Sequence, residues 1–300
     1  TVLLTGATGY IASKWLADLR PSGVRVIALM RPGGRVPESG NVGQLEVRSG
    51  ALDAVDPFSL IEGVDTVVHL AGCIPAVGRS AEEYLYINRD LALSLAQACA
   101  RRGVRFLLAS TSAIYGGTDG HLHAETEDEE GSTHPYAVSK HAAEQGLQAL
   151  GEQGLRYSIL RFGSVFGTAP RMQTVTAVNS FAAQAAGSGV IEVWKSASLQ
   201  VRPYTWVGDA SAAMHFVLEH DLFSGEIYNI VTENTMIARV LEMTHERFPG
   251  SSIRFVDHER MNTLSFGMDD AKIRHEGFVP TGSLSQGIDE LASYFESTHV

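Results

Sequence analysis

Tyr136 and Lys140 stand four residues apart in the run Tyr-Ala-Val-Ser-Lys and form the pair best suited to proton transfer. On a helix, this spacing puts both side chains on one face, one turn apart. A phenol has a reference pKa of about 10, and a neighbouring ammonium lowers that value because it favours the phenolate. We therefore expect Tyr136 to exchange protons near neutral pH, with Lys140 keeping it competent. The alternative is an exposed surface pair.

An apolar run that indicates a buried strand ends in three hydroxyl residues, Ser110, Thr111 and Ser112. A hydroxyl at the carboxyl end of a strand can hydrogen-bond a substrate carbonyl while a tyrosine protonates it. The alternative is that these hydroxyls cap the backbone locally. The residues alone leave both roles open.

A glycine-rich loop, Thr-Gly-Ala-Thr-Gly-Tyr-Ile-Ala at residues 5–12, follows the first expected strand and opens the first expected helix. Gly6 permits the sharp turn, and Gly9 lets the backbone approach a pyrophosphate closely. The helix that begins here offers unpaired N–H groups and a favourable dipole. The loop therefore predicts a dinucleotide site. Its alternative is a tight strand-to-helix turn.

The second expected strand predicts which dinucleotide binds. It ends at Met30 and Arg31 and carries no carboxylate, which would bind the ribose 2′-hydroxyl of NAD. Arg31 can instead pair with a 2′-phosphate, so we expect NADP(H) to be preferred over NAD(H). An exposed loop arginine is the alternative.

The elements that must position these residues alternate strand and helix over the first two thirds of the chain. Near-continuous apolar runs indicate strands buried on both faces, and this alternation predicts a doubly wound parallel sheet, the Rossmann architecture. Ligands bind beyond the carboxyl ends of such strands, where every motif above falls. The expected strands are Val2–Thr5, Arg25–Leu29, Leu45–Val47, Thr66–Leu70, Arg105–Ala109 and Tyr157–Arg161, and the expected helices are Tyr10–Leu19, Glu82–Ala100 and Tyr136–Leu150.

The pattern loosens after about Gly167, which predicts two parts. We expect residues 1–167 to form the dinucleotide-binding domain with the catalytic residues. Residues 168–300 are expected to form a smaller mixed α/β lobe for the substrate, with the chain crossing back between the two. We assign a strand at Glu226–Val231 and a helix at Ile237–Phe248 to this lobe.

The composition argues against several classes of protein. With a net charge of −11, the chain lacks the basic face that a nucleic-acid binder needs. No apolar run approaches the roughly 20 residues of a membrane span, and no signal peptide is visible, so we expect a cytoplasmic protein. Cys73 and Cys99 lie in no metal-ligand pattern, and we expect no metal.

The ordered motifs resemble the extended short-chain dehydrogenase/reductase family, the NAD-dependent epimerases and dehydratases, and above all its nucleotide-sugar-modifying branch. The likeness runs through nearly the whole chain. It is carried by TGATGYIA (5–12), HLAG (69–72), Asn88, STSAIYG (110–116), PYAVSK (135–140), LRFGSVFG (160–167) and VRPYTWVGDA (201–210).

The resemblance implies roles for individual residues. The family's catalytic hydroxyl lies 25 positions before the tyrosine, a spacing that Thr111 satisfies, with Ser112 as the alternative. Lys140 would also hold the nicotinamide ribose. The cofactor site would comprise Gly6, Thr8, Gly9, Tyr10, Ile11, Arg31, Leu52, Leu70, Ala71, Gly72, Asn88, Tyr136, Lys140 and Val165. The substrate site would comprise Cys73, Thr111, Ser112, Ser164, Arg202 and Arg260.

Departures from the family pattern narrow the chemistry. Dehydratases follow their hydroxyl residue with Asp-Glu, but Ser112 and Ala113 stand here, which disfavours dehydration. The family's substrate-binding Asn is replaced by Ser164. In the RD(F/Y) motif, Arg202 survives as a diphosphate ligand but Pro203 replaces the aspartate. Arg202 and Arg260 could each instead be surface salt-bridge residues.

Four functions follow from this reading. The main hypothesis is an NADP-dependent reductase of a keto-sugar linked to a nucleotide, in which Tyr136 gives the proton and Thr111 polarises the carbonyl. The alternatives are an epimerase with the same residues and a reductase of a non-sugar carbonyl. A non-enzymatic NADP sensor is the remote alternative, since both Tyr136 and Lys140 are present. By family analogy, the segments Glu82–Ala100 and Tyr136–Leu150 would form the interface of a homodimer.

Overall fold

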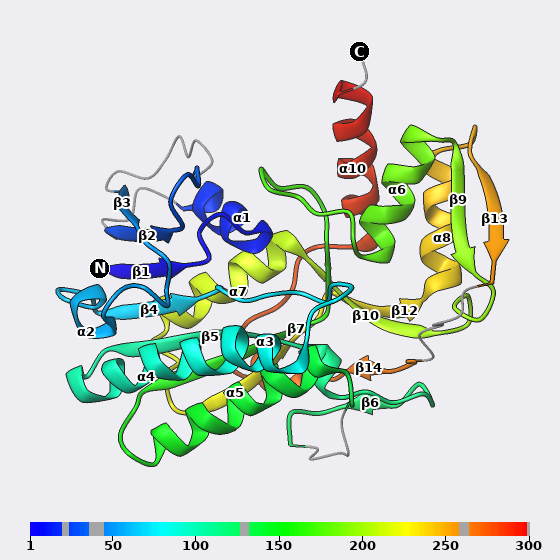
Figure 1. Ribbon diagram of the computed structural model, residues 1–300. Helices are drawn as coiled ribbons and strands as arrows, with labels where there is room; N and C mark the ends of the chain where they lie inside the picture. Colours follow the sequence, from blue (N-terminus) through cyan, green and yellow to red (C-terminus); the bar gives the residue numbers. More distant parts are fainter. Residues whose placement is uncertain (20–23, 36–44, 127–131, 258–263, 299–300) are drawn as a thin grey trace.

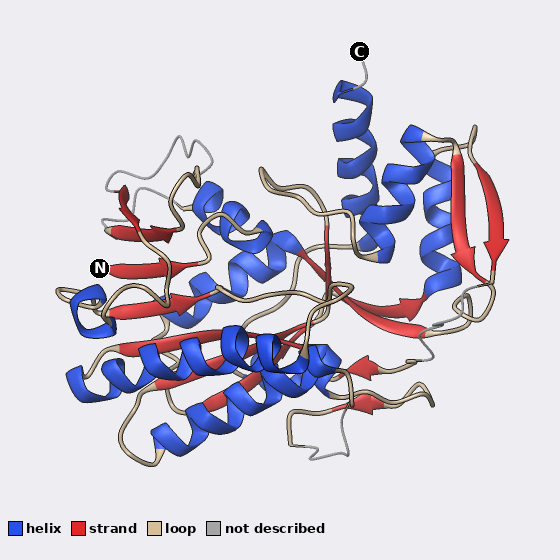
Figure 2. Ribbon diagram, viewed as in Figure 1, coloured by secondary structure: helices blue, strands red, loops and turns tan. Residues whose placement is uncertain are grey.

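The first strands of the chain are buried along their whole length, and they pair into one parallel sheet (Figure 1, Figure 2). The computed structural model describes residues 1–19, 24–35, 45–126, 132–257 and 264–298. The sheet has seven strands in the order β11-β7-β5-β4-β1-β2-β3, and every neighbouring pair is parallel. Its strands are β1 (Val2–Thr5), β2 (Val26–Met30), β3 (Leu45–Ser49), β4 (Thr66–His69), β5 (Arg105–Thr111), β7 (Tyr157–Phe162) and β11 (Glu226–Ile230).

Helices cover both faces of this sheet, as the alternating pattern predicts. Helices α1 (Tyr10–Asp18) and α7 (Val207–Glu219) pack over one face, where Trp15 and Met214 lie in one apolar core. Over the other face lie α2 (Pro57–Leu60), α4 (Leu91–Arg102) and α5 (Pro135–Gly151), around a second core that includes Leu95 and Leu147. The doubly wound fold predicted from the sequence is therefore confirmed.

A smaller part gathers at the carboxyl end of the sheet (Figure 1). Helices α6 (Ala177–Gly187), α8 (Ile237–Arg247) and α10 (Leu284–Thr298) surround a third core. Its sheets are β12-β10-β8, β13-β9 and β14-β6. These strands are β6 (Leu122–His123), β8 (Ser164–Phe166), β9 (Val190–Trp194), β10 (Val201–Trp206), β12 (Glu233–Met236), β13 (Ser252–Val256) and β14 (Gly267–Met268), and the short helix α9 (Ala271–His275) follows β14.

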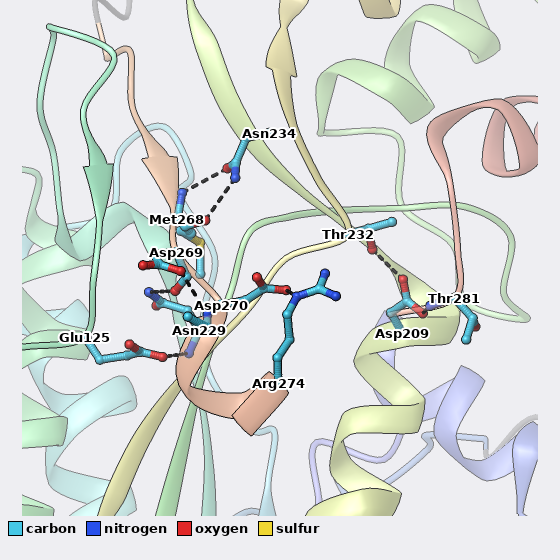
Figure 3. Close-up of polar contacts among 11 residues, drawn as sticks. Glu125, Asp209, Asn229, Thr232, Asn234, Met268, Asp269, Asp270, Arg274 and Thr281 are labelled. Atoms are coloured by element: carbon cyan, nitrogen blue, oxygen red, sulfur yellow. Dashed lines mark hydrogen bonds and ion pairs between the residues drawn. The ribbon is translucent and has the colours of Figure 1, made fainter. Parts of the chain in front are cut away.

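Polar side chains tie the smaller part to the large sheet and its own strands to one another (Figure 3). Asp209 at the start of α7 accepts hydrogen bonds from the Thr232 hydroxyl at 2.6 Å and the Thr281 amide at 2.8 Å. The side-chain amide of Asn234 exchanges two hydrogen bonds with the backbone of Met268, each of 2.9 Å. These contacts fix the connections that run between the sheets.

The structure differs from the sequence prediction in two elements. The strand at residues 226–230, which we assigned to the smaller lobe, pairs with β7 at the edge of the large sheet. A strand sequence reports burial but not its partner, so this placement had no local signal. The helix expected at Glu82–Ala100 contains a π-helical turn, η1 (Tyr86–Asp90), between α3 (Ala81–Leu85) and α4.

In the part of the chain that the structure describes, no helix is long and apolar enough to cross a lipid bilayer.

Candidate active site

A cavity of about 510 Å³ lies beyond the carboxyl ends of β1, β4, β5 and β7, where it meets the smaller part. Residues from the glycine-rich loop, from β5 and α5, and from the substrate side line it together. Among its described lining residues, Lys140 and Arg202 are the charged side chains, and both are cations. The cavity is therefore suited to an anionic ligand.

The glycine-rich loop forms a close backbone cradle at one end of the cavity. Gly6 has φ +70°, and a Cβ atom there would lie 2.6 Å from the Ala71 nitrogen and the Leu70 carbonyl carbon. Helix α1 starts after Gly9 without a side-chain cap, so its first N–H groups remain available. Both features fit the diphosphate of a dinucleotide cofactor.

Tyr136 and Thr111 both line the cavity, and their side chains share a hydrogen bond. Tyr136 occupies the first turn of α5, whose N-terminus is capped by the His134 side chain, and Thr111 ends β5. Burial raises the pKa of Tyr136, and a hydrogen bond with the Thr111 side chain opposes that rise. The expectation that Lys140 would lower the pKa of Tyr136 is wrong for this structure, because loss of solvent outweighs any effect of the neighbouring charge.

Lys140 lies one turn further along α5 and is 7% exposed. Its Nζ donates a hydrogen bond of 2.5 Å to the Ala109 carbonyl on β5. Burial lowers the pKa of Lys140 to about 8, although the Glu144 carboxylate acts in the opposite direction. Lys140 is thus a buried cation whose pKa lies close to neutral pH, so it can lose its proton in mildly alkaline solution.

Asn88 connects the loop after β4 to the catalytic helix. It lies in the π-helical turn and is 1% exposed. Its Oδ1 accepts from the Cys73 amide at 2.8 Å, and its Nδ2 donates to the Ser139 hydroxyl at 2.9 Å. Ser139 in turn donates to the Tyr136 carbonyl at 2.7 Å. The π-helical turn therefore fixes Cys73 relative to Tyr136.

Arg202 on β10 lies at the other end of the cavity. Its guanidinium donates to the Leu264 carbonyl and, at 2.7 Å, to Gln200 Oε1. Burial lowers the pKa of Arg202 to about 10, and the described residues provide it with no carboxylate partner. A partly buried cation with no carboxylate partner among the described residues is costly, which makes Arg202 a fitting ligand for an anionic group.

Most of the residues predicted from the sequence come together here. The cavity is lined by Gly6, Gly9, Tyr10, Ile11, Leu70, Gly72, Cys73, Asn88, Thr111, Ser112, Tyr136, Lys140, Ser164, Val165 and Arg202. Thr8, Arg31, Leu52 and Ala71 lie outside this lining, and Thr8 and Arg31 are exposed. Arg260 lies outside the described residues.

The sequence reasoning missed several lining residues. Gln173, Val175 and Thr176 come from the segment between β8 and α6, and Leu264 and Phe266 precede β14. None of these residues belongs to a motif, and they reach the cavity only through packing between segments that are far apart in the sequence. The described residues contain no group of His, Cys, Asp and Glu side chains that could hold a metal ion.

Fold and site together define an enzyme of the short-chain dehydrogenase/reductase type, with a close glycine-rich cradle, a tyrosine and a lysine that line one cavity, and a parallel sheet. A family model agrees: the NAD dependent epimerase/dehydratase family matches residues 2–231. The chain belongs to this family.

Proteins of known sequence or structure resemble the chain over nearly its whole length. The trifunctional UDP-glucose 4,6-dehydratase, 3,5-epimerase and reductase RHM1 of Arabidopsis thaliana is 25% identical over 98% of this chain, which spans 46% of that protein. MoeE5, solved with UDP-glucuronic acid and NAD, has TM-score 0.84 and 27% identity over 99% of both chains. The UDP-glucose 4-epimerase of Thermus thermophilus, solved with NAD, has TM-score 0.82 and 27% identity over 98% of both chains.

These structures overturn the prediction of NADP, because the similar proteins are complexes with NAD. The prediction rested on Arg31, which is exposed at the end of β2. A guanidinium carries only donors, and it can hydrogen-bond a ribose hydroxyl as well as a phosphate. An arginine without a nearby carboxylate therefore does not exclude NAD.

Proposed function

We propose that this protein is a UDP-hexose 4-epimerase that uses NAD. The observation that carries the proposal is the Thr111–Tyr136 pair in a cavity whose charged lining residues are both cations. Two further points support epimerisation over our first hypothesis of reduction. The argument for an NADPH-dependent reductase depended on Arg31, and the Thermus relative is a UDP-glucose 4-epimerase bound to NAD.

The residues of the chain have distinct tasks in this reaction. The reactive form of Tyr136 is its phenolate, the minor form near pH 7: it accepts the proton of the sugar 4-hydroxyl as that carbon is oxidised, and it returns the proton when the ketone is reduced on its other face. The Thr111 hydroxyl hydrogen-bonds the same oxygen and holds it beside Tyr136. Arg202 binds the substrate diphosphate, which leaves the sugar at the Tyr136 end of the cavity.

The residues present fit NAD through the Gly6 cradle and the uncapped start of α1. Gly6, Gly9 and Ile11 would hold its diphosphate, and Lys140 its nicotinamide ribose. When bound, NAD supplies the hydride acceptor and donor for the sugar carbon.

Dehydration needs a further acid and base beside the tyrosine, and this chain does not provide them at the expected positions. Ser112 and Ala113 follow Thr111 where dehydratases carry Asp-Glu. The cavity lining among the described residues contains no carboxylate at all. The sugar is thus expected to keep its hydroxyl groups.

The experiment follows conversion of UDP-glucose to UDP-galactose by the purified protein supplied with NAD, with the anomeric protons read by NMR. Tyr136→Phe should lower kcat by about 10²- to 10⁴-fold, since it removes the proton-transfer group. Tyr86→Phe, at an exposed position on η1, serves as the matched control and should keep full activity. A protein that consumes NADH with a 4-keto-sugar nucleotide and never epimerises would contradict the proposal.

A further inference from the structure

A buried ion pair lies directly behind the catalytic helix, and the reaction described above does not use it. Glu144 on α5 and Arg161 on β7 are 1% and 5% exposed at their side chains. Arg161 Nη2 donates to Glu144 Oε2 at 2.6 Å, and its Nε lies 3.2 Å from both carboxylate oxygens. Hydrophobic residues can often replace such a pair without loss of stability, so its presence beside an active site asks for another explanation.

The position of Glu144 relative to the active site is set by the helix. The spacing of four residues that joins Tyr136 to Lys140 continues to Glu144, so the three residues share one face of α5. Lys140 and Glu144 are both buried, and one helical turn separates them. Their charges interact through the protein interior, where solvent screens them weakly.

Several other titratable groups face Lys140, but they are neutral near pH 7. Burial lowers the pKa of His69 on β4 to about 3. Burial raises the pKa of Cys73, which follows β4, and also that of Tyr136 on the same helix as Lys140. Two neighbours raise the pKa of Lys140, and the effect of the Glu144 carboxylate is larger than that of Cys73.

A second set of contacts holds Arg161 on its β7 side, against Tyr115. Its guanidinium carbon lies 4.9 Å from the centre of the Tyr115 ring, and its Nη1 donates to the Tyr115 hydroxyl at 2.9 Å. That hydroxyl donates to Asn229 Oδ1 at 2.6 Å. The negative end of the pair is therefore the end that shares a helix with Lys140.

Asn229 anchors this chain of contacts in the substrate side of the molecule. Its Nδ2 donates to the carbonyls of Asp269 at 2.9 Å and His123 at 3.1 Å, and its backbone amide donates to Glu125 at 2.8 Å (Figure 3). Asn229 is fully buried. The Glu144 carboxylate is thus held in place by contacts that extend to the segment around β14.

We propose that Glu144 is a positioning residue for catalysis: its carboxylate, fixed by Arg161, keeps the buried Lys140 ammonium charged and directed at the active site. Glu144 touches neither substrate nor cofactor and acts through Lys140. The inference deepens the proposed function, and it rests on that function for the role of Lys140 in the reaction. The charge of Lys140 itself can be measured without any substrate.

The experiment measures the pKa of Lys140 directly. The chain contains four lysines, Lys14, Lys140, Lys195 and Lys272, so the side-chain NMR signals of isotope-labelled lysine can be resolved in the full-length protein. Lys140→Arg identifies the signal by its disappearance. We expect a pKa of about 8 in the unmodified protein.

Two variants remove or displace the negative charge of Glu144. The pair Glu144→Gln with Arg161→Met leaves no unpaired buried charge, and it should lower the pKa of Lys140 by about 1 unit, because the opposite charge that raises this pKa is lost. Glu144→Asp keeps the charge but shortens the side chain by one methylene, which displaces the carboxylate from its place against Arg161, and it should give a smaller shift in the same direction. Glu152→Gln, which removes an exposed carboxylate at the end of the same helix, should leave the pKa unchanged.

A pKa of Lys140 that stays at its original value in either folded Glu144 variant would overturn the inference. If the proposed function also holds, the alkaline limb of the pH profile for kcat should move to lower pH together with the pKa. An unmodified protein that epimerises no UDP-hexose would instead defeat the proposed function, while the lysine titration still decides the role of Glu144.

Discussion

Thr111 and Ser112 are adjacent hydroxyl residues at the end of β5, but their surroundings differ. Thr111 shares a hydrogen bond with Tyr136, and its Oγ1 also accepts from the Ala113 amide at 3.2 Å. Ser112 begins a 3₁₀ turn, η2 (Ser112–Ile114), and is 7% exposed. The geometry thus favours Thr111 as the hydroxyl that holds the substrate oxygen.

Thr111→Val should lower kcat by about 10²-fold, because a hydrogen bond to the developing charge is lost. The pKa of Tyr136 should also rise further, since the bond that opposes the effect of burial is removed. Ser112→Ala serves as the matched comparison and should keep kcat within a few-fold of the original. Initial rates with UDP-glucose check both variants. A larger loss in Ser112→Ala than in Thr111→Val would reverse the assignment.

At the residue scale, motifs predicted positions better than they predicted ionisation or cofactor choice. The motif residues Gly6, Thr111, Tyr136 and Lys140 line one cavity, because Gly6 and Thr111 stand at strand ends and Tyr136 and Lys140 lie in the first turns of α5, whose locations the fold dictates. The pKa values of Tyr136 and Lys140 depend on desolvation by residues far away in the sequence, and the spacing of a motif does not encode that burial. Arg31 gave a wrong prediction of NADP because a guanidinium can hydrogen-bond either a ribose 2′-hydroxyl or a 2′-phosphate.

At the scale of elements, the segment between β8 and α6 is fastened to the first helix. The Tyr10 hydroxyl on α1 donates to the Gly167 carbonyl at 2.5 Å. Asn179 on α6 is fully buried; its Oδ1 accepts from the Gly167 amide at 3.0 Å and its Nδ2 donates to the Gln173 carbonyl at 2.8 Å. This segment contributes Gln173, Val175 and Thr176 to the cavity that would hold the cofactor.

Asn179→Ala should release this segment and speed the dissociation of NAD. Each buried backbone group left unpaired costs about 1–3 kcal/mol, so we expect the off-rate to rise about tenfold or more. Exchange of bound NAD against labelled NAD in solution measures it. Asn234→Ala removes a comparable pair of hydrogen bonds to Met268 outside the cavity lining and should leave the off-rate unchanged. Equal off-rates in the two variants would contradict this role of the segment.

The boundaries of a strand could be predicted from the sequence where the strand is buried along its whole length. Strand β1 matches its prediction at both ends, and β2 and β4 match within a residue or two, because apolar runs end where the sheet ends. The small sheets could not be predicted in the same way. Strand β14 has two residues and pairs with β6, which lies far away in the sequence. The π-helical turn at Asn88 serves contacts with Cys73 and Ser139 that only the fold creates.

At the scale of the whole molecule, the paired helices α4 and α5 form one side of the structure (Figure 1). Tyr86 on η1 and Val138 on α5 are 47% and 44% exposed. Large exposed apolar side chains on packed elements are typical of surfaces for association. The homodimer expected from the resemblance would bury this side.

We predict that the protein sediments as a dimer at micromolar concentration, and that Tyr86→Glu with Val138→Glu makes it a monomer, because charges would be buried without partners. Val279→Glu, at an apolar position that is 55% exposed elsewhere, should remain dimeric. Sedimentation velocity distinguishes these cases. A monomeric unmodified protein would refute the prediction.

Strand β11 enters the large sheet late in the chain and covers β7, whose six residues are all buried. During synthesis on the ribosome, β7 emerges about 65 residues before its partner, so its unpaired edge is exposed for several seconds at ordinary rates of translation. An apolar edge of this kind is a template for aggregation. Truncations that end before residue 226 should therefore accumulate as insoluble protein rather than as a working half-molecule.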